Sequence, residues 1–278
     1  MAPRPLVPRP LPVAVVQMSS QEDVTANLAK ARELVAEAAA RGAELVLLPE
    51  NFAFMAGDVE KRAHAEALDG EGPIVTFLRD TARAHKLTLV GGGMPERSPD
   101  AARPFNTCAV FSPAGELVAA YRKIHLFDVD VPNGRSYRES EATTAGDAPL
   151  TVDVRDVSVG LSVCYDLRFP ELYRKLTVAG ARVLLVPAAF TLQTGKDHWI
   201  ALLRARAIEN QAFVVAAGQW GTHSGGRATF GKSVVIDPWG EVIAQASEGV
   251  GVAVATLDFA YQERVRAALP CASHRRLA

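Results

Sequence analysis

Short apolar runs alternate with amphipathic stretches along most of this chain. Residues 13–17, 44–49 and 183–187 are largely apolar segments of strand length, as expected for strands that are covered on both faces. Between the first two runs, apolar side chains recur at helical spacing from about residue 20 to residue 41, and Gly42 ends the pattern. The pattern therefore predicts an α/β fold.

Further helices and strands follow the same alternation. The predicted helices cover residues 74–86, 198–210 and 261–269 and the segment after Pro170, and the predicted strands cover residues 87–91, 151–163 and 212–217. Residues 106–123 and 233–245 each predict a hairpin, with turns at residues 112–115 and 237–240. Residues 124–150 predict a long loop, and loops of that length are usually functional.

Two segments of the first half of the chain resemble two segments of the second half. Residues 45–52 match residues 183–190, and the turn segment 112–118 matches residues 237–243. A single match could arise by chance, because strands and turns reuse the same kinds of residues. Two matches in the same order favour an internal duplication. We therefore predict a four-layer α-β-β-α sandwich of two pseudo-symmetric halves.

Composition is consistent with one large globular domain. The chain has 278 residues, of which 49% are hydrophobic, so it can bury a sizeable core. We assign residues 12–278 to a single domain and residues 1–11, rich in Pro and Arg, to a flexible tail that is not a targeting signal. The net charge of −1 favours neither nucleic acid nor a membrane surface as a partner, and no apolar run reaches the roughly 18 residues that span a bilayer.

The cysteines are few and far apart. Cys108, Cys164 and Cys271 are odd in number, and no two of them have the spacing of a metal or redox motif. This argues against a disulfide framework and against a zinc site. The simplest compartment for such a chain is the cytoplasm.

Three reactive side chains each end a strand-like segment. Cys164 follows an apolar run that begins at residue 157, Glu50 closes residues 44–50, and Lys123 closes residues 116–123. The carboxyl ends of strands form the rim where α/β proteins bind ligands. A thiol, a carboxylate and an ammonium at such a rim indicate a nucleophile, a base and an oxyanion stabiliser.

Each of these residues also has an ordinary structural explanation. A cysteine after a core strand is most often a small buried hydrophobe, and a single Glu or Lys at a strand end is most often solvated. The residues after Cys164 favour the functional interpretation, because Asp166 and Arg168 are costly to bury and are expected on a polar rim. If Glu50 lies against an apolar wall, its pKa should be raised.

Other motifs allow competing interpretations. His125 invites a Cys–His pair of the thiol-protease kind, and His198 could serve similarly, line a pocket or cap a helix. Residues 91–93 form a Gly-Gly-Gly run, which we assign to a turn because the Lys-Ser/Thr of a phosphate loop is missing. Arg204 and Arg206 are expected to form a salt-bridged helix face.

Taken together, the motifs resemble those of the nitrilase superfamily of carbon–nitrogen hydrolases. Its Glu motif is similar to residues 47–52, its Lys motif to residues 121–127 and its Cys motif to residues 163–172. A further glutamate between the Lys and Cys motifs corresponds to Glu139. The resemblance extends over residues 13–276, nearly the whole chain.

Within the superfamily, the chain is similar to the Nit branch. The similar stretches are residues 187–190, 194–195, 198–199, 203–210 and 237–240. Residues 204–209 and 221–223 favour the deaminated glutathione amidases over the ω-amidases. The chain departs from the family at Lys232, where a His is usual, and it ends soon after residue 276.

The resemblance implies a cysteine-dependent amidase that works through a thioester without metal or cofactor. Glu50, Lys123, Cys164 and Glu139 would be catalytic, and the backbone N–H of Tyr165 would help to hold the oxyanion. The substrate-binding residues implied or proposed alongside them are Arg168, Phe190, Thr194 and Trp199.

The implied substrate is a small 2-oxo acid amide, foremost deaminated glutathione, cleaved with release of an amine or ammonia. The alternatives, in order, are 2-oxoglutaramate or 2-oxosuccinamate, N-carbamoyl amino acids and nitriles. A catalytically idle scaffold protein is the alternative outside enzymology. The resemblance further implies a homodimer or a higher homo-oligomer.

Overall fold

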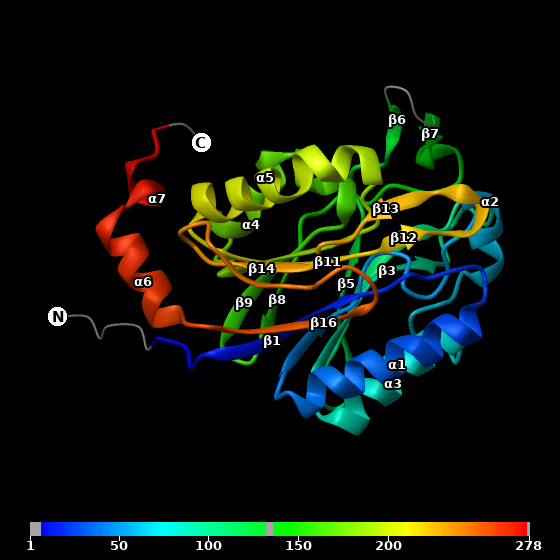
Figure 1. The fold of residues 1–278 in the computed structure, drawn as a ribbon, viewed down its shortest axis with the longest axis horizontal. Coiled ribbons are helices and arrows are strands. Elements are labelled where there is room, and N and C mark those ends of the chain that lie inside the picture. Colours follow the sequence, from blue (N-terminus) through cyan, green and yellow to red (C-terminus); the bar gives the residue numbers. More distant parts are fainter. Residues whose placement is uncertain (1–6, 132–135, 277–278) are drawn as a thin grey trace.

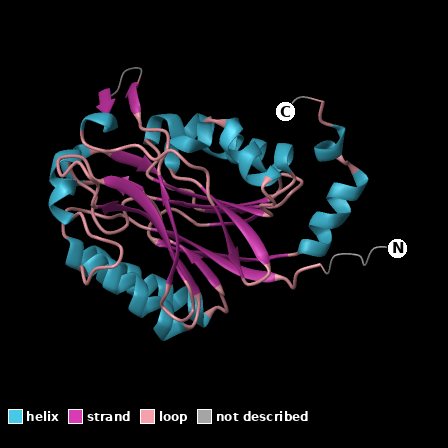
Figure 2. Ribbon diagram, turned by 180° about the vertical axis from the view of Figure 1, so that it is seen from behind, coloured by secondary structure: helices cyan, strands magenta, loops and turns pink. Residues whose placement is uncertain are grey.

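The chain folds into two six-stranded sheets packed face to face between two layers of helices (Figure 1; Figure 2). The computed structural model describes residues 7–131 and 136–276. The strands of the first sheet, in their order across it, are β16 (Gly251–Leu257), β1 (Leu11–Gln17), β2 (Leu45–Leu47), β3 (Thr88–Glu96), β4 (Phe105–Phe111) and β5 (Leu117–Arg122). Those of the second sheet are β15 (Val242–Gln245), β14 (Val234–Ile236), β11 (Phe213–Gly218), β10 (Val183–Ala188), β9 (Val157–Leu161) and β8 (Thr151–Val154).

Helices α1 (Val24–Ala40) and α3 (Pro73–His85) cover the first sheet, and α4 (Pro170–Val178) and α5 (Leu192–Asn210) cover the second (Figure 1). Outside these layers lie α2 (Asp58–Lys61), α6 (Phe259–Ala268) and α7 (Cys271–His274). Two small hairpins pair β6 (Asp128–Asp130) with β7 (Ser136–Arg138) and β12 (Trp220–Thr222) with β13 (Ala228–Phe230). The predicted four-layer α-β-β-α sandwich is confirmed.

Alternation along the strands explains why the sheets are buried on both faces. In β1, Val13 and Val15 belong to the core between the sheets, whereas Ala14 and Val16 pack with the residues of α1 and α3. Successive side chains of a strand point to opposite faces, so an unbroken apolar run supplies both cores at once. Continuous hydrophobicity in this sequence therefore signals a central layer, not a membrane segment.

The two sheets repeat one connectivity. In the first, β1, α1, β2, α3 and β3 are followed by the antiparallel hairpin β4–β5; in the second, β9, α4, β10, α5 and β11 are followed by β14–β15. An antiparallel strand flanks each set, β16 beside β1 and β8 beside β9. The matched segments of the sequence thus occupy equivalent strands, β2 with β10, and equivalent hairpin turns.

The glycine run differs from the sequence prediction. Residues 91–93 are not a turn but lie within β3, which extends to Glu96. A Cβ atom at Gly92 would lie 2.0 Å from the Leu48 carbonyl oxygen and 2.3 Å from the Pro187 Cβ atom in the opposite sheet. Glycine is required there because the two sheets approach closely, beside the strand ends that carry Glu50.

Three other predictions also differ from the structure. The predicted loop at residues 124–150 contains the β6–β7 hairpin and a 3₁₀ helix at Glu139–Glu141. Helix α5 begins at Leu192, before the predicted start at residue 198. The predicted tail ends earlier than residue 11, because Leu11 is fully buried in β1; its residues 1–6 lie outside the described residues.

Candidate active site

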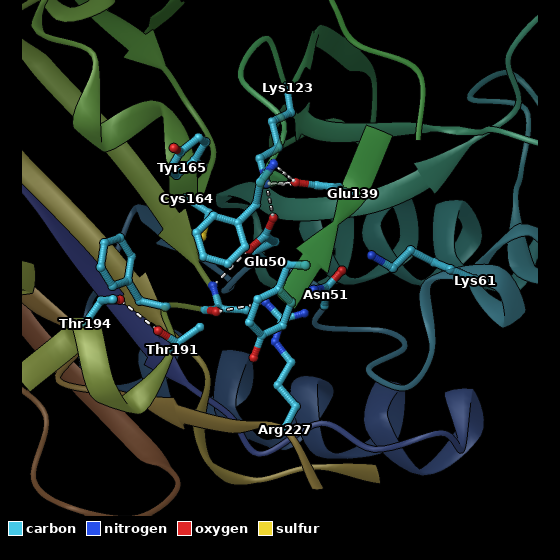
Figure 3. A pocket seen from close by; sticks show the side chains of 14 residues that line it. Glu50, Asn51, Lys61, Lys123, Glu139, Cys164, Tyr165, Thr191, Thr194 and Arg227 are labelled. Carbon is cyan, nitrogen blue, oxygen red and sulfur yellow. Dashed lines mark hydrogen bonds and ion pairs between the residues drawn. The ribbon is translucent and has the colours of Figure 1, made fainter. Parts of the chain in front are cut away.

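Glu50, Lys123, Glu139 and Cys164 meet in a single cavity at one end of the sandwich (Figure 3). Glu50 follows β2, Lys123 directly follows β5, and Cys164 opens a 3₁₀ helix after β9. Residues 50 and 164 therefore come from different sheets, and face-to-face packing brings their strand ends together. The structure thus brings the thiol, the carboxylate and the ammonium together, as the sequence predicts.

Buried ion pairs connect three of these side chains. Lys123 Nζ lies 3.1 Å from Glu50 Oε1 and 2.8 Å from Glu139 Oε2. Asn106 donates its amide Nδ2 hydrogens to Glu50 Oε1 at 2.9 Å and Glu139 Oε1 at 3.4 Å, and the Ala189 N–H donates to Glu50 Oε2 at 2.9 Å. Every carboxylate oxygen of Glu50 therefore has a partner, which fixes the orientation of this side chain.

The charges of this network are mutually stabilised. Burial alone would raise the pKa of Glu50, but the Lys123 ammonium, together with Lys61 and Arg227, lowers it to about 2. Burial would likewise lower the pKa of Lys123, yet Glu139 and Glu50 raise it well above its ordinary value. The expectation of a raised Glu50 pKa is wrong, because the wall around that carboxylate is cationic as well as apolar.

Cys164 is held in an unusual backbone conformation. Its φ is +50°, in the left-handed region that non-glycine residues rarely adopt, and its side chain lines the cavity. Burial raises the pKa of its thiol, and the negative charge of Glu50 raises it further, while Lys123 opposes both. The resting thiol is therefore protonated and lies beside a carboxylate that is already ionised.

Asp166 ties the cysteine turn to the lysine strand. Its carboxylate accepts hydrogen bonds from the Val163 N–H at 2.8 Å and the Tyr121 hydroxyl at 2.7 Å. It also accepts the His125 N–H at 3.1 Å and lies 2.7 Å from His125 Nδ1. Asp166 is fully buried, so its predicted place on a polar rim is wrong; four hydrogen bonds offset its desolvation.

Aromatic side chains form one wall of the cavity. Phe127, Tyr137, Tyr165 and Phe190 line it, with Thr191 and Thr194 beside them. The Phe127 ring packs 5.1 Å from Tyr137 and 5.0 Å from Tyr165, centroid to centroid. The cavity thus contains the predicted Tyr165, Phe190 and Thr194.

Two predicted substrate contacts lie elsewhere. Among the described residues that line the cavity, neither Arg168 nor Trp199 is found. Trp199 is fully buried behind Phe190, and its indole N–H donates to the Lys232 carbonyl at 2.9 Å. Arg168 lies over the Phe190 ring at 5.2 Å and 3.3 Å from His198 Nδ1. Trp199 thus supports the aromatic wall from behind, whereas Arg168 is partly exposed and lies over the rings of Phe190 and Tyr165.

Several cavity residues were missed from the sequence. Asn106, which holds Glu50 from outside the lining, lies near the start of β4, and a polar residue in that part of a largely apolar strand was the only signal in the sequence. Lys61 and Arg227 lie in segments with no apolar pattern. Many other cations occur in the sequence on either side of them. Only the tertiary fold brings these residues to the same cavity.

His125 is not paired with the thiol. Its ring stacks on Phe169 at 3.7 Å between centroids, and its Nδ1 atom faces Asp166. A Cys–His mechanism would need the imidazole in contact with the sulfur.

We expect the substitution His125→Asn to leave kcat within about threefold of wild type and to lower stability by roughly 1 kcal/mol, the worth of one hydrogen bond. Steady-state kinetics and thermal unfolding measure the two effects, with His198→Asn as the matched control. A thousandfold loss of kcat in folded H125N protein would instead support the thiol-protease interpretation.

The comparisons with known proteins agree with this geometry. The carbon-nitrogen hydrolase family model matches residues 12–267. The deaminated glutathione amidase of Synechocystis sp. (strain PCC 6803 / GT-S) is 44% identical over 270 residues, which cover 96% of this chain and 98% of that protein. The chloroplastic omega-amidase of Arabidopsis thaliana is 37% identical over 267 residues, covering 95% of this chain and 72% of that protein.

Solved structures show the same fold. Saccharomyces cerevisiae Nit3, a member of branch 10 of the nitrilase superfamily, superposes with a TM-score of 0.88 at 33% identity and covers 98% of each chain. The Caenorhabditis elegans NitFhit protein gives a TM-score of 0.90 at 42% identity, covering 98% of this chain and 66% of that one. The chain belongs to the carbon-nitrogen hydrolase family, enzymes that cleave carbon–nitrogen bonds. No helix in the described ranges combines the length and the hydrophobicity needed to cross a membrane.

Proposed function

We propose that this protein is a cysteine-dependent amidase whose substrate is a small 2-oxo acid amide, foremost deaminated glutathione. The observation that carries this proposal is the buried contact of Lys123 with both Glu50 and Glu139, in a cavity that also contains the Cys164 thiol. The relatives called deaminated glutathione amidase, similar over nearly their whole length, support the choice of substrate.

Acylation begins with a proton transfer coupled to attack. Glu50 accepts the thiol proton while the Cys164 sulfur forms a bond to the amide carbonyl carbon, and the carbonyl oxygen becomes an oxyanion. The Lys123 ammonium and the Tyr165 backbone N–H donate to that oxyanion. Because the thiol pKa is raised by burial and by Glu50, the thiolate forms only as the carbon–sulfur bond forms.

Collapse of the tetrahedral intermediate breaks the carbon–nitrogen bond. Glu50 returns its proton to the departing nitrogen, which leaves as an amine or as ammonia. The acyl group remains on Cys164 as a thioester. Glu50 then takes a proton from water as that water attacks the thioester carbonyl, and the proton passes to the sulfur as the acid is released. Glu139 keeps Lys123 charged and in place.

The second candidate, an ω-amidase, differs only in the leaving group. Deaminated glutathione and 2-oxoglutaramate carry the same 2-oxoglutaryl group on the scissile carbonyl; the first releases a dipeptide and the second ammonia. The similarity to the plant omega-amidase favours retaining this alternative. Substrate choice therefore depends on how the cavity treats the leaving group, since the acyl-enzyme is common to both.

A panel of amides tests the proposal. Purified protein is given deaminated glutathione, 2-oxoglutaramate, 2-oxosuccinamate, an N-carbamoyl amino acid and a nitrile, and release of amine or ammonia is measured. We expect the highest kcat/KM with deaminated glutathione. The proposal would be defeated if the protein hydrolysed neither deaminated glutathione nor 2-oxoglutaramate. Complete inactivity on the panel would favour the scaffold alternative.

We further propose that the protein acts in the cytoplasm as a homodimer or a higher homo-oligomer. The free cysteines among the described residues support a reducing compartment. Exposed apolar side chains on α5 and near the β14–β15 turn, among them Ile208 and Trp239, support self-association. Light scattering coupled to size-exclusion chromatography tests the oligomer, and a monomer at micromolar concentration would contradict it.

A further inference from the structure

A second hollow lies directly outside the active-site cavity. Tyr137 and Arg227 belong to the lining of both, so these two side chains form the boundary between them. The other described residues that line this outer hollow come from the segment before α2, from β7 and from the turn between β12 and β13, and none has a part in the steps above. They are Ala56, Gly57, Ser136, Ser224 and Gly225.

The proposed reaction gives each side of the cavity a different part of the substrate. When the Cys164 sulfur attacks, the carbonyl carbon carries three other groups, which are the oxyanion, the leaving nitrogen and the acyl chain. The oxyanion faces Lys123, and the leaving nitrogen must face Glu50, which returns the proton to it. The acyl chain takes the remaining direction, toward Phe190 and Thr194, which also line the cavity.

Arg227 lies on the Glu50 side of the cavity. The Ala189 N–H donates to Glu50 Oε2 at 2.9 Å, and the Ala189 carbonyl accepts from Arg227 Nη2 at 3.3 Å. The positive charge of Arg227 also contributes to the lowered pKa of Glu50. Figure 3 shows Arg227 approaching Glu50 from a different side than Thr191 and Thr194. A group that departs beside Glu50 therefore points past Arg227 into the outer hollow.

The outer hollow suits a short peptide. Its volume of about 400 Å³ falls in the range of small-molecule sites. The Arg227 guanidinium lies over the Tyr137 ring at 5.3 Å, and its buried Nε–H has no hydrogen-bond partner. A planar guanidinium with a donor to spare matches a peptide carbonyl or a terminal carboxylate. Among its described lining residues there is no carboxylate that would repel such a group.

We propose that the outer hollow binds the leaving group of the substrate, and that it favours a short peptide with a free carboxylate over ammonia. This inference rests on the proposed amidase function and deepens it, because it locates the choice between deaminated glutathione and 2-oxoglutaramate. Both substrates give the same acyl-enzyme, so they differ only up to the departure of the nitrogen. The value of kcat/KM reports that part of the reaction.

Bulky substitutions in the outer hollow test this choice. We expect Ala56→Trp and Ser224→Trp each to lower the ratio of kcat/KM for deaminated glutathione to kcat/KM for 2-oxoglutaramate by at least about tenfold. A filled hollow excludes the dipeptide, whereas ammonia needs no room there. The matched control is Ala114→Trp, in the exposed turn at the other end of β4 from Asn106, and its ratio should stay within about twofold of wild type.

Thermal unfolding establishes that each variant is folded, and the use of two positions guards against the loss of one. An unchanged ratio in the folded A56W and S224W proteins would overturn the inference. A larger loss with 2-oxoglutaramate than with deaminated glutathione would also overturn it, since the acyl chain would then occupy the outer hollow.

A substrate analogue tests the carboxylate. In this analogue of deaminated glutathione, the terminal glycine ends in a carboxamide, and the acyl group is unchanged. We expect wild-type protein to hydrolyse it with kcat/KM about tenfold lower, mostly through KM, because a charge-assisted hydrogen bond is lost. Equal kcat/KM for the acid and the carboxamide would overturn the preference for a free carboxylate.

A binding measurement separates this inference from the proposed function. Calorimetry with Cys164→Ala protein measures the affinity for intact deaminated glutathione without turnover. We expect A56W in this background to weaken binding by at least about tenfold, and A114W to change it by less than about twofold. Equal affinity in A56W and the parent, or no measurable binding in the parent, would overturn the inference even if wild-type protein hydrolyses amides. Weakened binding in a protein that hydrolyses no amide would leave the peptide site standing and reject the amidase.

Discussion

Cys164→Ala protein is expected to fold normally and to lose at least about 10⁴-fold in kcat on every amide that the wild type cleaves. Glu50 accepts the proton of the thiol, and Lys123 stabilises the oxyanion that forms when the sulfur attacks. Neither residue therefore contributes much to the rate without the sulfur. The left-handed backbone at residue 164 is tolerated by alanine no worse than by cysteine, so stability should change little. Kinetics and chemical denaturation measure both quantities.

Cys271→Ala is the matched control. Cys271 is exposed on α7, far along the chain from the cavity residues, and its loss should leave kcat unchanged. Cys108 is a less suitable control because it is fully buried between the sheets, where a smaller side chain leaves a void. A tenfold or smaller loss in C164A protein would remove the thiol from the mechanism.

Lys123→Met should have the second-largest effect, on activity and on stability together. The substitution leaves the carboxylates of Glu50 and Glu139 buried without their cation, and breaking a buried ion pair from one side costs about 3–5 kcal/mol. It also removes a donor to the oxyanion, for which we expect a loss in kcat of roughly 10²–10³-fold. Denaturant titration and steady-state kinetics test the two parts separately.

The pH dependence of this variant gives an independent check. With Lys123 present, the pKa of Glu50 is about 2, so this carboxylate is ionised throughout the working range. Without that ammonium, burial is the largest remaining influence and raises the pKa of Glu50. We expect a new acidic limb in the kcat/KM profile of K123M that wild-type protein lacks. A profile identical in shape would contradict the assigned electrostatics.

Linkage gives the direction of the stability change with pH. The pKa of Glu50 is lower in the folded protein than the ordinary value of 4.5, so its contribution is present above that value and disappears as the pH falls toward 2. The pKa of Lys123 is raised, so its contribution to stability is present below its ordinary value of 10.5 and disappears only in strong alkali.

A double substitution, Lys123→Met with Glu139→Gln, removes one charge of each sign and should recover part of the stability that Lys123→Met alone loses.

The fold was predictable because its signals are local. The apolar runs at residues 13–17, 44–49 and 183–187 are strands, and the two matched turns are the hairpins of equivalent halves. The Gly-Gly-Gly run was misassigned because glycine also permits close packing between sheets, which needs knowledge of the opposite strand. Pro187, the residue that Gly92 contacts, is almost a hundred positions away.

The cavity was only partly predictable for the same reason. Glu50, Lys123 and Cys164 could be found because each terminates a recognisable strand. Glu139 lies in the long loop after Lys123, where a glutamate is most often solvated, and the family resemblance was needed to favour its role beside Lys123. The pKa of Glu50 could not be deduced, because it depends on Lys61 and Arg227, which belong to irregular segments. The burial of Asp166 was equally hidden, since its distant partners, Tyr121 and His125, lie on β5 and just beyond it.

One measurement tests the central claim directly, namely that Cys164 becomes acylated while Glu50 and Lys123 handle the proton and the charge. Wild-type protein is mixed with 2-oxoglutaramate, quenched in acid during turnover, digested and analysed by mass spectrometry. We predict a 2-oxoglutaryl group on the peptide that contains Cys164 and none on those with Cys108 or Cys271. Continued hydrolysis by C164A protein, with no acylated peptide in the wild type, would contradict the account.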